Sequence, residues 1–160
     1  MVNHYTYVLA SDGDLQEPIT LGASSLAGHL GLSHLIVFYD SNEIQISGGV
    51  SRCDSTNYAT VFEGFGWHVQ EIDGHDHEAI RSAIEKAQIM DKPSIIIGKT
   101  IMAKGSAGME RDHNTHGAPL PDDDIYATKD ALGLASESIL LPDADKTHFQ
   151  SRLDLINKTV

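Results

Sequence analysis

Cysteine is almost absent from this chain, which has one, Cys53, among 160 residues. A single thiol excludes an internal disulfide and a metal cluster built from several thiolates. Basic residues are also scarce, because 11 Lys and Arg stand against 23 Asp and Glu, giving a net charge of −12. Binding to phosphate backbones needs clustered cations, so we expect no nucleic-acid partner and no anionic membrane surface.

Long apolar runs are missing as well. No stretch approaches the length of a membrane span, and the first residues, MVNHYTY, lack the basic, apolar and small-residue pattern of a signal peptide. We therefore expect a cytoplasmic protein whose partners are small molecules or other proteins.

Strand-like apolar runs alternate with helical patterns along most of the sequence. Hydrophobic residues make up 41% of the chain, enough for a single domain over residues 1–160. The predicted strands are 5–10, 35–40, 67–72 and 94–99, and the predicted helices are 19–30, 57–65, 77–90, 123–132 and 144–156. This order predicts an α/β fold with a mainly parallel sheet flanked by helices, its strands buried on both faces.

Polar residues follow the first two predicted strands where each strand ends. Asp12 and Gly13 come after the first, in YVLASDGDLQEP, and Asn42 follows the second, 30 positions after Asp12. Ligands of parallel sheets gather at the carboxyl ends of the strands, and the two strand ends that carry these residues can lie side by side there. Carboxylate and amide oxygens suit Mg²⁺ or Ca²⁺, and so few protein ligands need oxygens from a phosphate-bearing molecule to complete the coordination. Gly13 lets the backbone approach a diphosphate without a Cβ in the way.

The stretch Ser11-Asp12-Gly13, followed by Asp40-Ser41-Asn42, resembles the thiamine-diphosphate signature of Gly-Asp-Gly and a later Asn. Four blocks resemble transketolases, in order and at compatible spacing: SSLAGHLGLSHLIVFYDSNEIQISG (24–48), FEGFGWHV (62–69), DKPSIIIGKT (91–100) and THGAPL (115–120). The resemblance covers almost the whole chain. It implies a partial thiamine-diphosphate-binding fold, in which residues 1–160 are the C-terminal part of the diphosphate-binding (N-terminal) domain.

The resemblance implies a metal site that joins the protein to the cofactor. Asp12, Asn42 and the main-chain carbonyl of Ile44 match the family's Mg²⁺ ligands, and Gly13 matches the glycine against the diphosphate. The implied cofactors are thus thiamine diphosphate and Mg²⁺, with Ca²⁺ as the alternative ion.

Three further positions match cofactor or catalytic residues of the family. Glu17 matches an acidic residue near the subunit interface and the pyrimidine ring, and Met102 matches an apolar residue that lines the cofactor cleft. His116 matches the catalytic histidine that contacts the diphosphate and the bound sugar. An imidazole there suits proton exchange near neutral pH.

The implied reaction moves a two-carbon ketol unit from a ketose phosphate to an aldose phosphate in the pentose phosphate pathway. The family closes its cleft with a pyrimidine-binding domain from a partner subunit, so we expect sugar-phosphate substrates, a homo-oligomer, and a missing pyrimidine-binding domain or subunit. Because the cofactor carries out its chemistry between both domains, we expect the isolated chain to be inactive.

Three positions depart from the family pattern. Ser11 stands in place of the first signature glycine, Pro18 in place of another glycine, and Gly22 where transketolases commonly carry a second interface glutamate. Pro18 and Gly22 alter the start of the helix that carries the interface acids.

Other interpretations stay open for the site and for the chain. Asp12 suits a turn or helix N-cap, Glu17 a carboxylate in a first helical turn, and His116 an exposed loop. The chain as a whole suits a non-catalytic truncated remnant, one subunit of a split thiamine-diphosphate enzyme, or an enzyme similar to deoxyxylulose-phosphate synthase.

Overall fold

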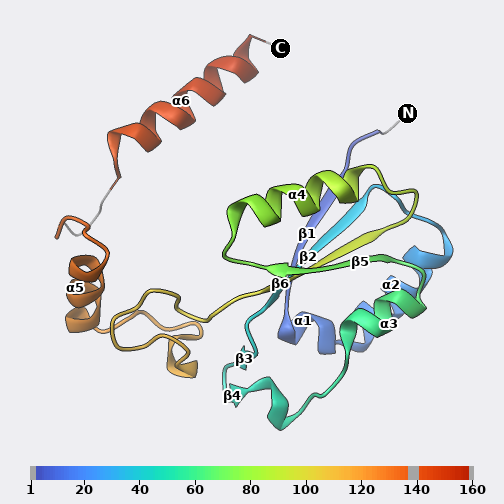
Figure 1. Ribbon diagram of the computed structural model, residues 1–160, viewed down its shortest axis with the longest axis horizontal. Coiled ribbons are helices and arrows are strands. Elements are labelled where there is room, and N and C mark those ends of the chain that lie inside the picture. Colours follow the sequence, from blue (N-terminus) through green and yellow to red (C-terminus); the bar gives the residue numbers. More distant parts are fainter. Residues whose placement is uncertain (1–2, 137–140, 159–160) are drawn as a thin grey trace.

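The centre of the molecule is a parallel sheet of four strands. The computed structural model describes residues 3–136 and 141–158. The strands are β1 (Thr6–Ser11), β2 (Leu35–Ser41), β5 (His68–Asp73) and β6 (Ser94–Lys99), in the order β1-β2-β6-β5 (Figure 1). All three strand pairs are parallel, which confirms the predicted α/β fold.

Helices cover both faces of this sheet. The helices α1 (Asp12–Gln16), α2 (Pro18–His29) and α3 (Tyr58–Gly64) lie on one face, and α4 (His77–Gln88) lies on the other (Figure 1). The predicted helices correspond to α2, α3 and α4, with ends that differ by one or two residues.

Alternating side chains divide the core into two clusters, because successive residues of a strand point to opposite faces. The cluster on the α2 and α3 side comprises Leu15, Ala27, Val37, Tyr39, Tyr58, Phe62, Trp67, Ile95 and Ile97. The cluster on the α4 side comprises Ile36, Ala83, Ala87 and Ile96. β2 and β6, the inner strands, contribute to both clusters, as their continuous apolar runs predict.

The edge strand β1 corrects one prediction. Its sequence predicts burial on both faces, but Tyr7 is 53% exposed and Leu9 is 85% exposed. Among the described strands β1 pairs with β2 alone, so its other edge is open. The apolar composition of β1 therefore leaves hydrophobic surface uncovered in the described part of the chain.

The segment after β1 is helical, where the sequence predicts only a connection. Asp14 accepts hydrogen bonds from both the N–H and the hydroxyl of Ser11, at 2.8 Å each, and so caps α1. The backbone of Ser11 is extended, with φ of −116°, so this position does not need the family's glycine. Pro18 occupies the first position of α2, where proline is favoured. Two of the three departures are thus accommodated locally.

A small hairpin follows β2 and was not predicted. It consists of β3 (Ile44–Gln45) and β4 (Gly48–Gly49), and the short 3-10 helix η1 (Val50–Arg52) comes next. The hairpin lies beside α1, and residues of both line one pocket.

The chain after β6 leads away from the sheet. A long loop with the 3-10 helix η2 (His113–Thr115) reaches α5 (Asp122–Ala131), and α6 (Asp143–Asn157) stands apart in Figure 1. Both α5 and α6 confirm predicted helices. Asp124 of α5 fixes the loop by accepting hydrogen bonds from the Ser106 hydroxyl, at 2.6 Å, and the Gly108 N–H, at 2.7 Å. No helix within 3–136 or 141–158 is long and apolar enough to span a membrane.

Candidate functional site

The carboxyl ends of three strands finish level with one another. Ser11 pairs with Asp40 across β1 and β2, and Ser41 pairs with Lys99 across β2 and β6. Two adjoining pockets of about 640 Å³ and 660 Å³ open at this edge, and Asp12, Asn42, Ile44 and Gly49 line both. The sheet therefore brings together residues that lie far apart in the sequence.

The 640 Å³ pocket gathers six of the seven predicted site residues. These are Asp12, Gly13, Glu17, Asn42, Ile44 and His116. Met102 is placed elsewhere, in a separate pocket of about 230 Å³ that Thr115 and Leu120 also line. The structure thus joins residues from α1 and its C-terminal end, the turn after β2, β3 and the long loop, but not Met102.

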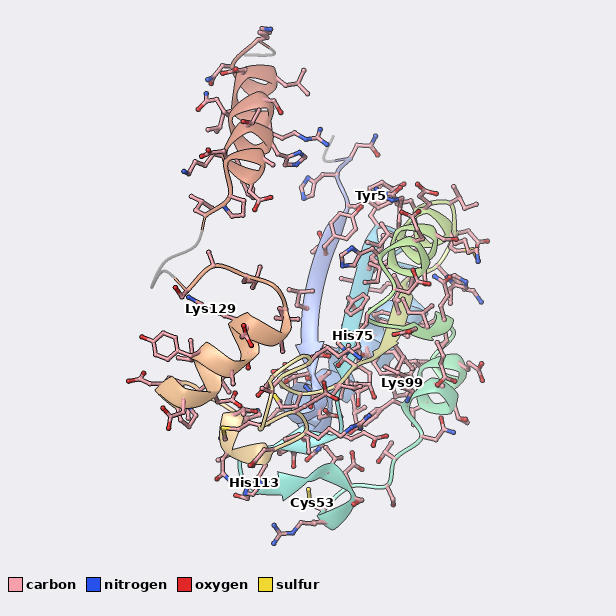
Figure 2. All side chains as sticks on the ribbon, turned by 60° about the vertical axis from the view of Figure 1, so that its left-hand side comes forward. Tyr5, Cys53, His75, Lys99, His113 and Lys129 are labelled. Carbon is pink, nitrogen blue, oxygen red and sulfur yellow. The ribbon has the colours of Figure 1, made fainter. Side chains whose placement is uncertain are left out.

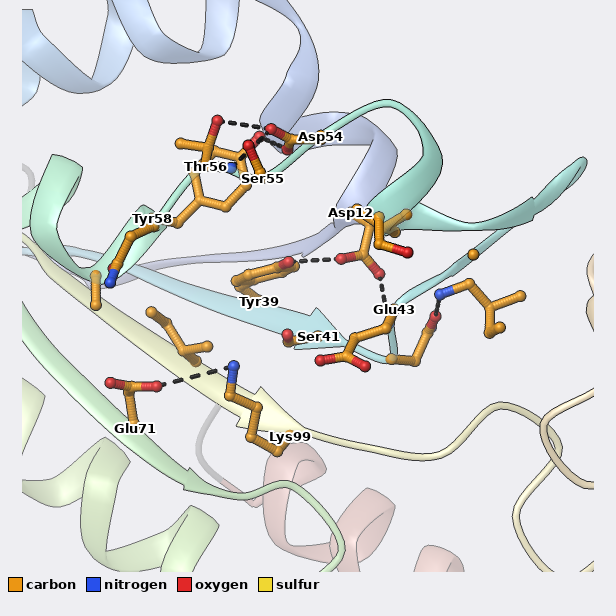
Figure 3. Close-up of a pocket in the computed structure, with 18 of the residues that line it drawn as sticks. Asp12, Tyr39, Ser41, Glu43, Asp54, Ser55, Thr56, Tyr58, Glu71 and Lys99 are labelled. Atoms are coloured by element: carbon orange, nitrogen blue, oxygen red, sulfur yellow. Dashed lines mark hydrogen bonds and ion pairs between the residues drawn. The ribbon is translucent and has the colours of Figure 1, made fainter.

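Asp12 is the buried carboxylate of the site. Its side chain is 3% exposed, Oδ1 accepts a hydrogen bond from the Tyr39 hydroxyl at 2.6 Å, and Oδ2 accepts one from the Glu43 N–H at 3.1 Å (Figure 3). Burial raises the pKa of Asp12, and the neighbouring Asp40 adds to this rise. No Lys, Arg or His forms an ion pair with Asp12 in the described part of the chain. A buried carboxylate with two donors and no cation suits a metal ion.

Asn42 presents its amide in a fixed orientation. Its Nδ2 donates to Oδ2 of Asp40 at 3.1 Å, and its Oδ1 accepts from the Ile44 N–H at 2.9 Å. Glu43, between them, has φ of 63° in the left-handed region, and its N–H is the group that reaches Asp12. The turn 42–44 therefore holds Asn42 and Ile44 beside the Asp12 carboxylate.

Neither the backbone conformation nor the packing of the described residues requires a glycine at position 13. Its φ is not in the left-handed region, and a Cβ at this position would meet no atom within 4 Å. Glycine inside a helix is normally disfavoured relative to alanine. Space beside the backbone is thus left free on the pocket side of α1.

Glu17 and His116 approach the pocket from different segments. Glu17 separates α1 from α2, and His116 follows η2 on the long loop. Both side chains are exposed. His116 is thus an exposed loop histidine, as the simpler interpretation predicts. The loop nevertheless places it at the pocket that Asp12 also lines.

Several residues at this edge were missed from the sequence. Tyr39 and Asp40 hold the predicted ligands, and Arg52 and Cys53 line the 640 Å³ pocket. The thiol of Cys53 is exposed, near the hairpin (Figure 2), with Sγ 3.2 Å from Oε1 of Gln45. Tyr39 lies within an apolar strand, where nothing in the sequence marks its hydroxyl as part of a site.

Acidic, histidine and cysteine side chains do not form a self-sufficient metal centre here. Within the two described ranges, no three of them group closely enough to hold an ion. The predicted metal ligands are one carboxylate, one amide oxygen and one carbonyl, so a bound ion needs oxygens from another molecule.

Residues 1–158 match the family described as "Transketolase, thiamine diphosphate binding domain". The chain belongs to this family. The transketolase of Sinorhizobium medicae is 44% identical over 142 residues, which are 89% of this chain and 20% of that protein. The family resemblance is thereby confirmed.

Solved transketolase structures have the same fold as this chain. The Campylobacter jejuni enzyme has a TM-score of 0.93 and 42% identity, covering 96% of this chain and 24% of that one. The Pichia stipitis transketolase in complex with sedoheptulose 7-phosphate has a TM-score of 0.92 and 35% identity, covering 98% of this chain and 24% of that one. The chain thus spans about a fifth to a quarter of the transketolases it matches.

Proposed function

We propose that this chain binds Mg²⁺ and the diphosphate end of thiamine diphosphate in the 640 Å³ pocket. The observation that carries the proposal is the meeting of Asp12, Asn42 and Ile44 at one sheet edge, with the free space at Gly13 beside them. The matched family domain is described by its thiamine diphosphate binding. Asp12, Asn42 and the Ile44 carbonyl would hold the metal ion, and Gly13 would lie against the diphosphate.

The residues present fit this cofactor in charge as well as in shape. The Asp12 carboxylate is buried without a cationic partner in the described residues, and a divalent ion would balance its charge. His116 and Arg52 line the same pocket and offer donors to phosphate oxygens. When bound, thiamine diphosphate supplies the carbanion chemistry, and the protein's part is to bind and orient it.

The parent reaction that we infer is two-carbon ketol transfer from a ketose phosphate to an aldose phosphate in the pentose phosphate pathway. The similar Pichia stipitis transketolase is described in complex with a ketose phosphate, sedoheptulose 7-phosphate. We propose that His116 contacts the sugar and diphosphate, and that Glu17 lies at the subunit interface beside the pyrimidine ring. The chain covers 20% of the Sinorhizobium relative, so we infer that it does not turn over substrate without a pyrimidine-binding domain or subunit.

Calorimetric titration with thiamine diphosphate, in Mg²⁺ and in EDTA, tests the binding function. We expect binding in Mg²⁺ only. Gly13→Ala should weaken it by at least about 10-fold, because a Cβ would occupy the space beside the diphosphate. The same variant should unfold at the same or a slightly higher urea concentration, since alanine is favoured in a helix by about 0.5–1 kcal/mol. Equal affinity of Gly13→Ala and wild type would contradict the placement of the diphosphate, and no binding in Mg²⁺ would contradict the function.

The open edge of β1 supports the proposal of a partner chain. Leu9 on β1 and Ile19 on α2 are 85% and 77% exposed. Unpaired strand edges with apolar side chains associate unless they are charged or covered. We expect the ligand-free chain to self-associate in multi-angle light scattering, and Leu9→Lys to shift it toward the monomer. The control is Ile89→Lys, an 83% exposed apolar residue at the end of α4, which should leave the mass unchanged. A wild-type monomer at high concentration would refute this expectation.

A further inference from the structure

The hydroxyl of Tyr39 is placed to control the Asp12 carboxylate. Tyr39 is 5% exposed and packs in the core between the sheet and α3. Its hydroxyl donates to Oδ1 of Asp12 at 2.6 Å, the short distance typical of a bond to a charged acceptor. The Glu43 N–H holds the other oxygen. The carboxylate therefore accepts one hydrogen bond from β2 and one from the turn after β2 (Figure 3).

Asp40, the next residue of β2, controls the orientation of the Asn42 amide. It accepts a hydrogen bond from Nδ2 of Asn42 at 3.1 Å and another from the hydroxyl of Thr100. An amide that points its NH₂ group at Asp40 must point its oxygen the other way. The amide oxygen then accepts the hydrogen bond from the Ile44 N–H. It retains a second lone pair, with which it can coordinate a hard cation.

We propose that Tyr39 and Asp40 are the positioning residues of this site, and that each fixes one of its two side-chain ligands for a divalent cation. This inference rests on the proposed function. The two residues are adjacent in the chain, so a single strand end sets the orientation of a ligand from α1 and a ligand from the following turn. Partners of this kind that orient metal ligands typically contribute 10–100-fold to metal affinity.

Tyr58 provides a matched control for Tyr39. It is buried to a similar degree, at 8% exposed, and its ring packs edge to face on Tyr39 at 5.9 Å between centroids. Its hydroxyl donates to Oδ2 of Asp54 at 2.7 Å, not to Asp12. Removing either hydroxyl leaves a phenylalanine of the same shape in the same cluster. Only the removal at Tyr39 takes away a hydrogen bond to the predicted metal ligand Asp12.

The test compares Tyr39→Phe and Tyr58→Phe in titrations of thiamine diphosphate at a series of Mg²⁺ concentrations, which yield a dissociation constant for the metal. We expect Tyr39→Phe to raise this constant about 10–100-fold and Tyr58→Phe to change it by less than about 2-fold. Equal constants for wild type and Tyr39→Phe would overturn the positioning role and leave the proposed function intact. If the wild type shows no Mg²⁺-dependent binding, the proposed function itself fails.

A second variant, Asp40→Ala, tests the role of Asp40 first in the ligand-free chain and then by metal binding. The Asn42 side-chain NH₂ signals, identified in the nuclear magnetic resonance spectrum by their loss in Asn42→Ala, should move toward those of a freely exposed asparagine. The metal dissociation constant should rise in parallel. Unchanged NH₂ signals together with an unchanged constant would overturn the role of Asp40, whatever the outcome for Tyr39→Phe.

Discussion

Replacing Asp12 by asparagine should reduce Mg²⁺-dependent affinity for thiamine diphosphate by at least about 100-fold, yet leave the ligand-free chain at least as stable at pH 7. Binding is lost because the site has only three predicted protein ligands, and this one carries the charge. Stability is kept because the new amide can be satisfied in place. Its oxygen accepts from the Glu43 N–H, and its NH₂ donates to the Tyr39 hydroxyl, which can accept as well as donate.

The pH dependence of stability gives this prediction a second measurement. Burial raises the pKa of Asp12 above its ordinary value of 3.8, so the folded chain holds this proton more tightly than the unfolded chain does. The resulting contribution to the free energy of unfolding is fully present below pH 3.8 and is lost as the pH rises through the raised pKa. Asparagine does not ionise, so the variant should gain stability relative to wild type across that window.

Urea titrations of the ligand-free wild type and of Asp12→Asn, carried out from about pH 3.5 to about pH 7, would measure this difference in the free energy of unfolding. Comparing the two proteins cancels the groups that act in the opposite sense. Hydrogen bonds from Thr56 lower the pKa of Asp54, and hydrogen bonds from Ser11 lower that of Asp14. A variant that is less stable at pH 7 and still binds the cofactor would show that Asp12 serves the fold and not the metal.

The sequence was sufficient for the sheet and the main helices because their signals are local. Apolar runs such as 35–40 and 94–99 are long enough to mark inner strands, and the helices between them have regular apolar positions. The helix α1 escaped prediction because it has only five residues, DGDLQ, too few to show a helical period. The exposure of β1 was not predicted either, because composition does not reveal which strand lies at the edge of a sheet.

The site was predictable where it follows from strand ends and unpredictable where it depends on register. Asp12 and Asn42 each follow a strand, so a parallel sheet brings them together. The contact of Tyr39 with Asp12, by contrast, depends on where two elements begin and end. It requires that α1 begins at Asp12 and that β2 continues past Tyr39. The capping of α1 by Asp14 through Ser11 depends on the same local geometry. The path of the long loop, which separates Met102 from His116, has no local signal either.

Two glycines of α2 should respond in opposite ways to the same substitution. A Cβ at Gly28 would lie 1.8 Å from the carbonyl oxygen of Phe65, a backbone atom that cannot rotate away. A Cβ at Gly22 would meet no atom within 4 Å. We expect Gly28→Ala to lower the free energy of unfolding by about 3 kcal/mol or more, and Gly22→Ala to raise it by about 0.5–1 kcal/mol through helix propensity.

The clash at Gly28 is difficult to relieve because a buried hydrogen bond at Ser24 holds α2 against the core. The indole N–H of Trp67 donates to the carbonyl oxygen of Ser24 at 2.8 Å in the buried interface, and Trp67 in turn packs edge to face on Phe62. Moving α2 away from Phe65 would break that bond and open the core cluster. Thermal unfolding followed by circular dichroism should therefore show a midpoint lower by roughly 10 °C for Gly28→Ala. Similar midpoints for the two variants would mean that α2 is free to shift. In that case the close contact between α2 and the end of α3 would not explain why residue 28 is a glycine.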